Sequence, residues 1–393
     1  MELQTISGPP STDPESPTAP LGISKPPTPP QNSYKKHLPL LVFLVFGSTF
    51  IGGFLALVNS GDSWTEFTTV TEHYGVGDWS EVLKYRVDLW CEGGDIRTNL
   101  LNHAGPIETW NTSVVTSFKN LFRDCKCSIS ENNHPDTCDP DLRLWDTRNV
   151  EDMSHAFQNN EIFTGKGLDD WDVSGVKSMK HMFDHCSIFN STSLSNWKTT
   201  SVTDITSIFS HAPIFNVDIS TWDTSSLTKM SKAFYAAEDF NRDLSGWNTG
   251  NVEEMDFMFA FTKHEEASSM NRLTSRYGVG GWDVSSVKYF TGMFEFNDYF
   301  NEDLSGWNTK EAVSMADMFN SAGWADGRGI NQDLSSWNVT KVEHFDNFLC
   351  LANTFSESNK EKLCDVNVAH KSWLSNFCDS GIGWSNFPAD PCA

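Results

Sequence analysis

The sequence predicts an α/β repeat solenoid with short parallel strands and short helices, disulfide-capped ends and one N-terminal transmembrane helix. Three observations support this fold class: a recurring tryptophan, an apolar pattern behind each tryptophan, and cysteines that gather before and after the repeats. The tryptophans are Trp110, Trp145, Trp171, Trp197, Trp222, Trp247, Trp282, Trp307 and Trp337. Most are 25 or 26 residues apart, with longer gaps of 30 and 35. Such spacing is typical of stacked supersecondary units that accept loop insertions.

Each repeat carries apolar residues eight, eleven and twelve positions after its tryptophan. After Trp247 these are Met255, Met258 and Phe259. Because residues three and four apart share a helix face, this part of each repeat is predicted to form a short amphipathic helix. The stretch around the tryptophan, such as residues 244–249, is short and rich in Ser and Thr. It is predicted to be a short strand or an extended segment.

The Met and Phe columns are predicted to be the core of the solenoid and not a cofactor or ligand groove. One unit of 25 residues cannot bury a Trp, a Phe and several Met or Val side chains by itself. Stacked units would place equivalent side chains on one another. We therefore predict a nine-coil solenoid over residues 107–349 and expect no cofactor.

The N-terminal region differs in composition from the repeats. Residues 1–37 are rich in Pro, Ser and Thr, which predicts a disordered cytosolic tail. The uncharged stretch Leu38–Val58 is long enough to cross a hydrocarbon core of about 30 Å as a helix. Since Lys35 and Lys36 precede it, the positive-inside rule predicts a type II signal anchor with residues 59–393 outside. The plasma membrane is the expected location, and a secretory-pathway membrane is the alternative.

Eight of the nine cysteines lie near the ends of the predicted solenoid. They are Cys91, Cys125, Cys127 and Cys138 at its start, and Cys350, Cys364, Cys378 and Cys392 at its end. End coils have no neighbour to cover their apolar faces, so a cap or stem is predicted at residues 59–106 and a Cys-rich cap at residues 350–393. Two disulfides are expected at each end, with the pairing open. A zinc site of Cys125, Cys127 and Cys138 is the weaker alternative, and Cys186 is expected to be a buried thiol.

Three sequons for N-linked glycosylation agree with an extracellular domain. They place candidate glycans on Asn111, Asn190 and Asn338. Asn111 and Asn338 directly follow a tryptophan, where most repeats have Asp or Asn. A turn-forming role therefore explains these two residues without a sugar.

The formal net charge of −24 belongs to residues 59–393, because acids and lysines balance in the first 58 residues. No nucleic acid partner is expected, since phosphate backbones require the opposite sign. An aspartate recurs four residues before the tryptophan in five repeats, at Asp141, Asp218, Asp243, Asp303 and Asp333. Such a ladder could hold calcium. The favoured alternative is that each Asp caps a turn through backbone N–H groups.

Four histidines fall at equivalent positions of adjacent repeats. His155 and His181 lie ten residues after their tryptophans, and His185 and His211 lie fourteen residues after theirs. Stacked coils would place all four on one face, where they could bind a metal or respond to pH. The favoured alternative is that position ten is simply exposed, because Asn, Ser, Lys, Gly and Asp occupy it in five other repeats.

The repeat resembles that of BspA-type leucine-rich-repeat surface proteins, which also occurs in mycoplasma lipoprotein-associated families. The resemblance rests on residues 240–249, 300–309 and 331–339, where Asn, Asp, Leu and a Trp followed by Asn recur in one order. It extends over residues 107–349 and implies a leucine-rich-repeat-like solenoid on a cell surface, used in adhesion or in binding proteins or glycans. It implies no catalytic residues. The chain differs from the bacterial pattern in its internal anchor and its cysteine caps.

The leading hypothesis is therefore a single-pass membrane-anchored surface protein whose extracellular solenoid binds macromolecular partners, either a protein or a glycan. Specificity is expected in the longest insertions, Arg123–Pro140, Thr262–Gly280 and Ser321–Gly329. The alternative is a lumenal type II membrane enzyme such as a glycosyltransferase. Only the Asp139-Pro-Asp141 motif favours that alternative, so no enzymatic activity is expected.

Overall fold

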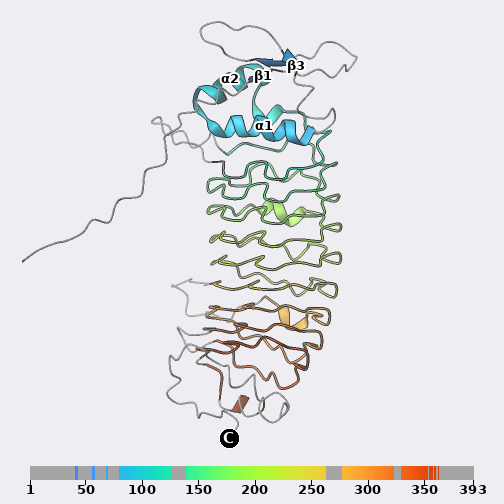
Figure 1. Ribbon diagram of the computed structural model, residues 1–393, viewed down its shortest axis with the longest axis vertical. Helices are drawn as coiled ribbons and strands as arrows, with labels where there is room; N and C mark the ends of the chain where they lie inside the picture. The colour runs from blue at the N-terminus through green and yellow to red at the C-terminus, as the bar shows by residue number, and fades with distance from the viewer. Residues whose placement is uncertain are drawn as a thin grey trace, which may run out of the picture.

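The repeats wind into a stack of coils with two helices at the N-terminal end of the stack (Figure 1). The computed structural model describes residues 79–125, 139–262, 277–322 and 329–352, with short pieces at 40–42, 55–57, 68–69, 354–356, 358–359 and 362. Positions within a coil are counted from its tryptophan, so that +8 lies eight residues after it.

The regular elements lie mostly outside the repeats. Helices α1 (Trp79–Glu92) and α2 (Gly94–Ala104) precede the first coil. Three short 3₁₀ helices each end directly before a tryptophan: η1 (Ile107–Thr109), η3 (Thr192–Asn196) and η4 (Val279–Gly281). Strands β1 (Leu40–Val42), β2 (Leu55–Leu57) and β3 (Thr68–Thr69) form an antiparallel sheet in that order.

Strands β1 and β2 fall inside Leu38–Val58, the stretch predicted to be a transmembrane helix. The six described residues of that stretch are extended and pair with each other, Leu40 opposite Leu57. Its other residues, like the predicted tail at residues 1–37, lie outside the described part of the chain. Among the helices that the structure describes, none combines the length and the apolar character needed to span a bilayer.

The part of each repeat that was predicted to be a short helix is a series of turns instead. Positions +10 and +14 have positive φ in every coil, between 52° and 60°. An α-helix requires negative φ, so it cannot pass through these positions. The apolar spacing at +8, +11 and +12 therefore has another cause: the turns aim those side chains at the core, where Met153, Ala156 and Phe157 are fully buried.

The turns are held by an alternating pattern of backbone hydrogen bonds. The amides at +8, +10, +12 and +14 donate to the next coil, as in His155 N to the Lys180 carbonyl (2.7 Å) and Asn159 N to the Asp184 carbonyl (2.8 Å). The amide at +11 closes a turn within its own coil, as in Ala156 N to the Met153 carbonyl (3.1 Å). Positive φ costs a non-glycine residue about 1–2 kcal/mol, and these bonds offset that cost.

Among the described residues of the coils, parallel pairing is limited to one residue per coil, at position +7. The bridges run through Ser117, Asp152, Ser178, Asp204, Lys229, Glu254, Tyr289, Ser314 and His344. The prediction of short parallel strands around the tryptophan was therefore wrong in both place and length. Around the tryptophan, side-chain hydrogen bonds and ring stacking join neighbouring coils. The described residues there form no continuous ladder of backbone hydrogen bonds.

The tryptophans form one of those side-chain columns. From Trp145 onward, each indole N–H donates to the carbonyl at position −3 of the preceding coil, as in Trp222 to Leu194 (2.9 Å) and Trp247 to Ile219 (3.2 Å). The Trp110 indole of the first coil donates instead to the Gly105 carbonyl, at 3.1 Å. Rings of neighbouring coils stack along much of this column, with centroids 6.3 Å apart and planes 3° apart for Trp222 and Trp247. Both rings are 3–4 % exposed.

Phenylalanines form a second, double column beside the tryptophans. Position +12 stacks on position +18 of its own coil, as Phe183 does on Phe189 at 4.0 Å, and on position +12 of the next coil, as Phe183 does on Phe209 at 5.8 Å. Aromatic pairs of this kind contribute about 0.5–1.5 kcal/mol each beyond the area that they bury. The core therefore runs without interruption along the described coils.

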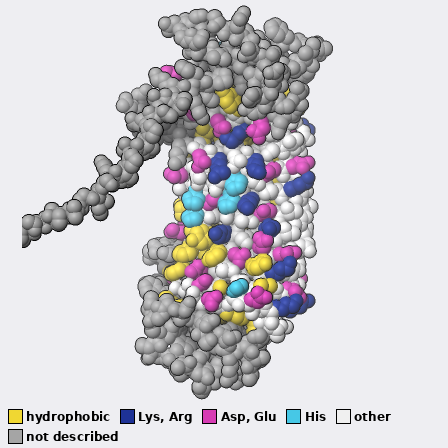
Figure 2. All heavy atoms as spheres, in the orientation of Figure 1, with side chains coloured by type: hydrophobic (Ala, Val, Ile, Leu, Met, Phe, Trp, Pro, Cys, Tyr) yellow, Lys and Arg dark blue, Asp and Glu magenta, His cyan; other side chains and the backbone are white. Residues whose placement is uncertain are grey.

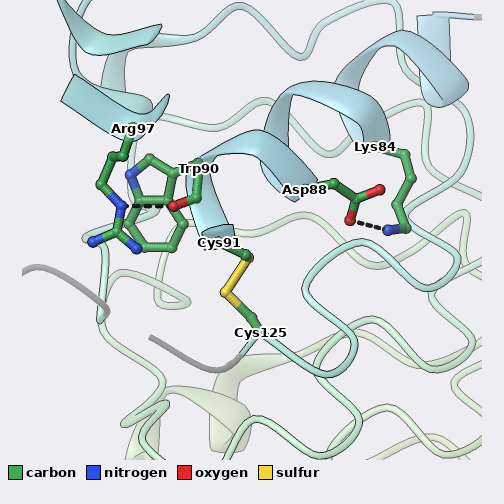
Figure 3. Close-up of a disulfide and its surroundings, with 6 residues drawn as sticks. All are labelled: Lys84, Asp88, Trp90, Cys91, Arg97 and Cys125. Carbon is green, nitrogen blue, oxygen red and sulfur yellow. Dashed lines mark hydrogen bonds and ion pairs between the residues drawn. A yellow bond between two sulfur atoms is a disulfide. The ribbon is translucent and has the colours of Figure 1, made fainter. Parts of the chain in front are cut away.

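Helix α1 covers the exposed end of the first coil. Its Trp90 meets Phe122 edge-to-face at 6.1 Å, and the Ser80 hydroxyl accepts the amides of Thr116 and Ser117, which have no preceding coil to bond. A disulfide joins Cys91 at the end of α1 to Cys125 (Figure 3). The Arg97 guanidinium lies over the Trp90 ring, 4.4 Å from its centroid.

The other predicted cap cysteines are only partly described. Cys350 is buried and disulfide-bonded. Cys127, Cys138, Cys364, Cys378 and Cys392 lie outside the described residues. Cys186 is a free, buried thiol, as predicted; burial raises its pKa well above the usual range, and its Sγ donates to the Phe157 carbonyl at 3.1 Å.

The indole hydrogen bond can be tested with Trp222→Phe. The ring stack survives this change, but the Leu194 carbonyl loses one of its two donors in a dry core, so the free energy of unfolding should fall by about 1–3 kcal/mol. Chemical denaturation of the purified protein measures this loss. Leu144→Ala, at a site that is 67 % exposed, is the control and should change stability by less than about 0.5 kcal/mol. Equal losses in the two variants would contradict the role of the bond.

The positive φ positions can be tested with Ala236→Gly, because φ is 53° at Ala236. Glycine removes the left-handed penalty and adds unfolded-state entropy, and the balance should stabilise the protein by about 0.5–1 kcal/mol. Ala237→Gly is the matched control at the next residue, which is fully buried and should be destabilised by about 1 kcal/mol. Thermal unfolding of both variants distinguishes the two positions, and destabilisation by Ala236→Gly would refute the argument.

Candidate functional site

One edge of the stack, which we call the turn edge, is built from positions +10, +13 and +14 of the coils. Positions +10 and +14 have positive φ and lie on either side of +13 in the sequence. The side chains at +10 and +14 are mostly exposed or half-buried. Figure 2 shows histidines gathered beside apolar side chains on the face in view. Because the backbone there is bonded coil to coil, side chains on this edge are held at a fixed spacing.

The four predicted histidines come together on the turn edge. His155 stacks on His181 with ring centroids 4.8 Å apart, and His185 stacks on His211 at 4.0 Å. The side chains of His185 and His211 are 50 % and 43 % exposed. The imidazoles therefore form two short stacks across three coils.

Asp184, at position +13, lies between the two stacks, and the sequence analysis did not identify it. Its side chain is 7 % exposed. One carboxylate oxygen, Oδ2, accepts from His181 Nδ1 (2.9 Å) and Gln158 Nε2 (2.8 Å). The other, Oδ1, accepts from His185 Nδ1 (2.7 Å) and lies 3.8 Å from His211 Nδ1. Extending the column count to +13 would have found it, since Gln158 occupies that position in the preceding coil.

Electrostatics favour an ionised Asp184. Burial opposes the charge, but interactions with His181, His211 and Gln158 outweigh it and hold the pKa of the carboxyl well below its usual range. His155 behaves differently: burial lowers the pKa of its imidazole, and its hydrogen bond with Gln158 opposes that effect. The carboxylate is thus a fixed negative charge among imidazoles.

The turn edge continues from the histidines into aromatic side chains. Tyr235 lies 5.1 Å from the His211 ring and 5.4 Å from Phe261, and Phe261 stacks on Phe296 at 4.7 Å. Lys232 Nζ lies over the Phe257 ring, 5.4 Å from its centroid. The rings thus connect several successive coils along one edge.

Isoleucines add an apolar column at position +17, three residues beyond +14. Ile162, Ile188 and Ile214 occupy it in three consecutive coils and are 38 %, 46 % and 41 % exposed. Large apolar side chains that recur at an exposed position are not needed for the core. They are typical of contact surfaces.

Glu295 occupies the same +13 position as Asp184 in a later coil, with different chemistry. Its carboxylate accepts from Asn320 Nδ2 at 3.1 Å. Burial, and secondarily the nearby charge of Asp317, raise the pKa of Glu295 to about 7. Asp184 is stabilised as an anion by donors, whereas burial and the nearby Asp317 let Glu295 keep its proton to higher pH than a free glutamate.

The predicted Asp ladder caps turns. Asp141, Asp218, Asp243, Asp303 and Asp333 each accept the backbone N–H of the residue two positions later, at 2.8–3.2 Å. This confirms the favoured alternative. Asp218, Asp243 and Asp303 also line a surface hollow of about 940 Å³, and binding of calcium stays a prediction.

The sequon asparagines Asn111, Asn190 and Asn338 are exposed. The side chains of Asn111 and Asn338 accept the amide of the residue two positions later, at 3.0 and 3.1 Å, which is the predicted turn role. Asn190 accepts the Asn216 amide of the next coil at 3.1 Å. Glycosylation of all three stays a prediction.

Both acids of the Asp139-Pro-Asp141 motif are engaged by neighbours. Asp139 accepts the Thr164 amide at 3.0 Å, and Asp141 accepts the Arg143 amide and forms an ion pair with its guanidinium at 2.8 Å. Asp141 thus caps a turn, and Asp139 holds the backbone of Thr164, which lies 25 residues further along the chain. The three long insertions, Arg123–Pro140, Thr262–Gly280 and Ser321–Gly329, mostly lie outside the described residues, which stop within them at position +15 of the coil, at Cys125, Thr262 and Ala322.

The repeat region matches one family model, described as "Mycoplasma protein of unknown function, DUF285". Four overlapping matches extend over residues 97–166, 127–216, 191–276 and 265–377. Together they cover well over half of the 393-residue chain. No curated protein and no solved structure gives a significant match.

The raised pKa of Glu295 predicts a pH-dependent gain from Glu295→Gln. A free glutamate has a pKa of about 4.3, and about 7 in the folded protein. The folded state therefore binds the proton more tightly, and ionisation destabilises it progressively as the pH rises between these values. Glutamine cannot ionise, so the melting temperature of the variant should exceed that of the wild type above about pH 7 and match it near pH 4.

Glu253→Gln is the control, because its exposed carboxylate pairs with Lys288 Nζ at 2.7 Å. That pairing lowers the pKa of Glu253, so no gain at high pH is expected. A parallel pH response of the two variants would contradict the effect of burial on Glu295.

Proposed function

We propose that this chain, which belongs to the repeat family described as "Mycoplasma protein of unknown function, DUF285", is a single-pass membrane-anchored surface protein that binds another protein through the turn edge of its extracellular solenoid. The finer resemblance to BspA-type surface proteins supports a role in adhesion or recognition. The uncharged stretch Leu38–Val58, after Lys35 and Lys36, supports the anchor and its orientation.

One observation carries the proposal: aromatic rings and isoleucines form a connected, partly exposed edge on a backbone that is bonded coil to coil. Phe261 and Phe296 stack at the surface, and Tyr235 joins them to the histidines. Aromatic side chains are enriched in protein interfaces and dominate their binding energy. A rigid scaffold also reduces the entropy lost on binding.

The composition of this edge favours a protein partner over a glycan. Ile162, Ile188 and Ile214 offer no polar group to a sugar, and neither do the two phenylalanines. The net charge of −24 would also steer a basic partner surface toward this chain. The lumenal enzyme alternative has no comparable support, because both acids of its one motif are engaged in contacts with neighbouring residues.

The double variant Phe261→Asn/Phe296→Asn tests the turn edge. Asparagine tolerates positive φ and already occupies +14 as Asn159, so the coil should keep its shape. Loss of two central aromatic side chains should weaken adhesion of cells that display the full chain by about tenfold or more. The control is Val114→Ser/Leu144→Ser, which removes two exposed apolar residues elsewhere and should leave adhesion unchanged.

The same adhesion assay can use target cells treated with protease or with glycosidase. Loss of adhesion after protease alone is the expected result. Adhesion that survives protease and is lost after glycosidase would identify a glycan partner and refute the choice of a protein. Antibody staining of a C-terminal tag on intact cells tests the orientation, and a tag accessible only after permeabilisation would contradict display at the plasma membrane.

A further inference from the structure

The residues around Asp184 have the chemistry and arrangement of a metal site. Asp184, His185 and His211 each offer a ligand atom, and the three atoms lie within 4.8 Å of one another. Two imidazoles and one carboxylate are a donor set that zinc uses in sites with an open coordination position. Tetrahedral zinc with bonds of about 2.0–2.2 Å places its ligand atoms about 3.3 Å apart.

The separations around Asp184 Oδ1 lie on either side of that value. His185 Nδ1 is 2.7 Å from it and His211 Nδ1 is 3.8 Å from it. A small rotation of the two partly exposed imidazoles would equalise these distances. The backbone need not move, because the amides of His185 and His211 are each bonded to the next coil at 2.8 Å.

Asp184 is oriented as a metal-ligating carboxylate would be. Its second oxygen, Oδ2, is held by His181 Nδ1 and Gln158 Nε2, which leaves Oδ1 directed at the imidazole pair. Hydrogen bonds of this kind orient ligands in metal sites and contribute strongly to affinity. The adjacent thiol of Cys186 is buried and donates to the Phe157 carbonyl, so it does not compete for the metal.

We propose that Asp184 Oδ1, His185 and His211 form a surface site for a divalent transition metal of the zinc class, with His181 and Gln158 as positioning residues. Water would occupy the open coordination position. The same contacts without a metal describe an ion-pair network between Asp184 and protonated histidines, and the experiment separates the two.

Zinc titration of the full chain in detergent micelles by isothermal calorimetry tests the site at neutral pH. One zinc ion per chain is expected to bind and to raise the melting temperature of the protein. His185→Asn/His211→Asn should abolish both effects. Asparagine occupies the equivalent +14 position in the preceding coil, as Asn159, so this variant should fold.

His344→Asn is the control, since it removes an exposed imidazole at position +7 of a distant coil. It should keep stoichiometric zinc binding, whereas His181→Asn should weaken zinc binding by about 10- to 100-fold. Acidification to about pH 5.5 should release the metal, because its ligands must be deprotonated.

Absence of zinc binding to the wild-type chain would overturn the proposal. Equal binding by the wild type and the His185→Asn/His211→Asn variant would also overturn it, because the ion would then lie elsewhere. If the double variant changes the pH dependence of melting without any zinc effect in either protein, the cluster is an ion-pair network and the metal assignment is wrong.

Discussion

Each coil is joined to the next through the backbone carbonyl three residues before its tryptophan. In Leu142 this oxygen accepts the amide of Trp145 at 3.0 Å and the indole N–H of Trp171 in the next coil at 3.1 Å. Both lone pairs are used within a dry interior, where a lost partner costs about 1–3 kcal/mol. The tryptophan therefore fixes the depth and rotation of one coil relative to its neighbour, and the Met and Phe columns fill the space that this contact defines.

The turn edge follows from the way in which each coil closes. Two left-handed residues four positions apart reverse the chain, so +10 and +14 have surface-facing side chains while +13 is held between them. The amides of these coils bond to their neighbours, and identical positions are therefore brought together from residues far apart in sequence. This explains how Asp184 meets both His181 of its own coil and His211 of the next.

Much of the core could be predicted from the sequence. Equivalent residues of stacked coils share the same environment whatever backbone conformation each coil adopts, so recurring apolar positions identify the core. The chemistry of the histidine cluster could be predicted only in part. Shared offsets brought His155 to His181 and His185 to His211, but Asp184 was missed because the +13 column was not counted. The helix prediction was wrong for a physical reason: the spacing at +8, +11 and +12 fits a helix. Asn, Asp and His at many +10 and +14 positions favour left-handed backbone, but Lys or Phe at the same positions in other coils does not mark them.

The stacking that aligns side chains also means that the residue at one position limits which residue fits at the same position of the neighbouring coil. Gly292 shows this, because a Cβ at its +10 position would lie 2.3 Å from the ring of Phe257 at +10 of the preceding coil. The orientation of the Phe257 ring therefore requires a small residue at +10 of the next coil, whereas the histidine rings at +10 of earlier coils and the phenylalanine rings at +14 stack without such compensation. Residue identities at +10 of these two coils are thus coupled by the stacking itself, whereas the buried columns exchange one apolar side chain for another.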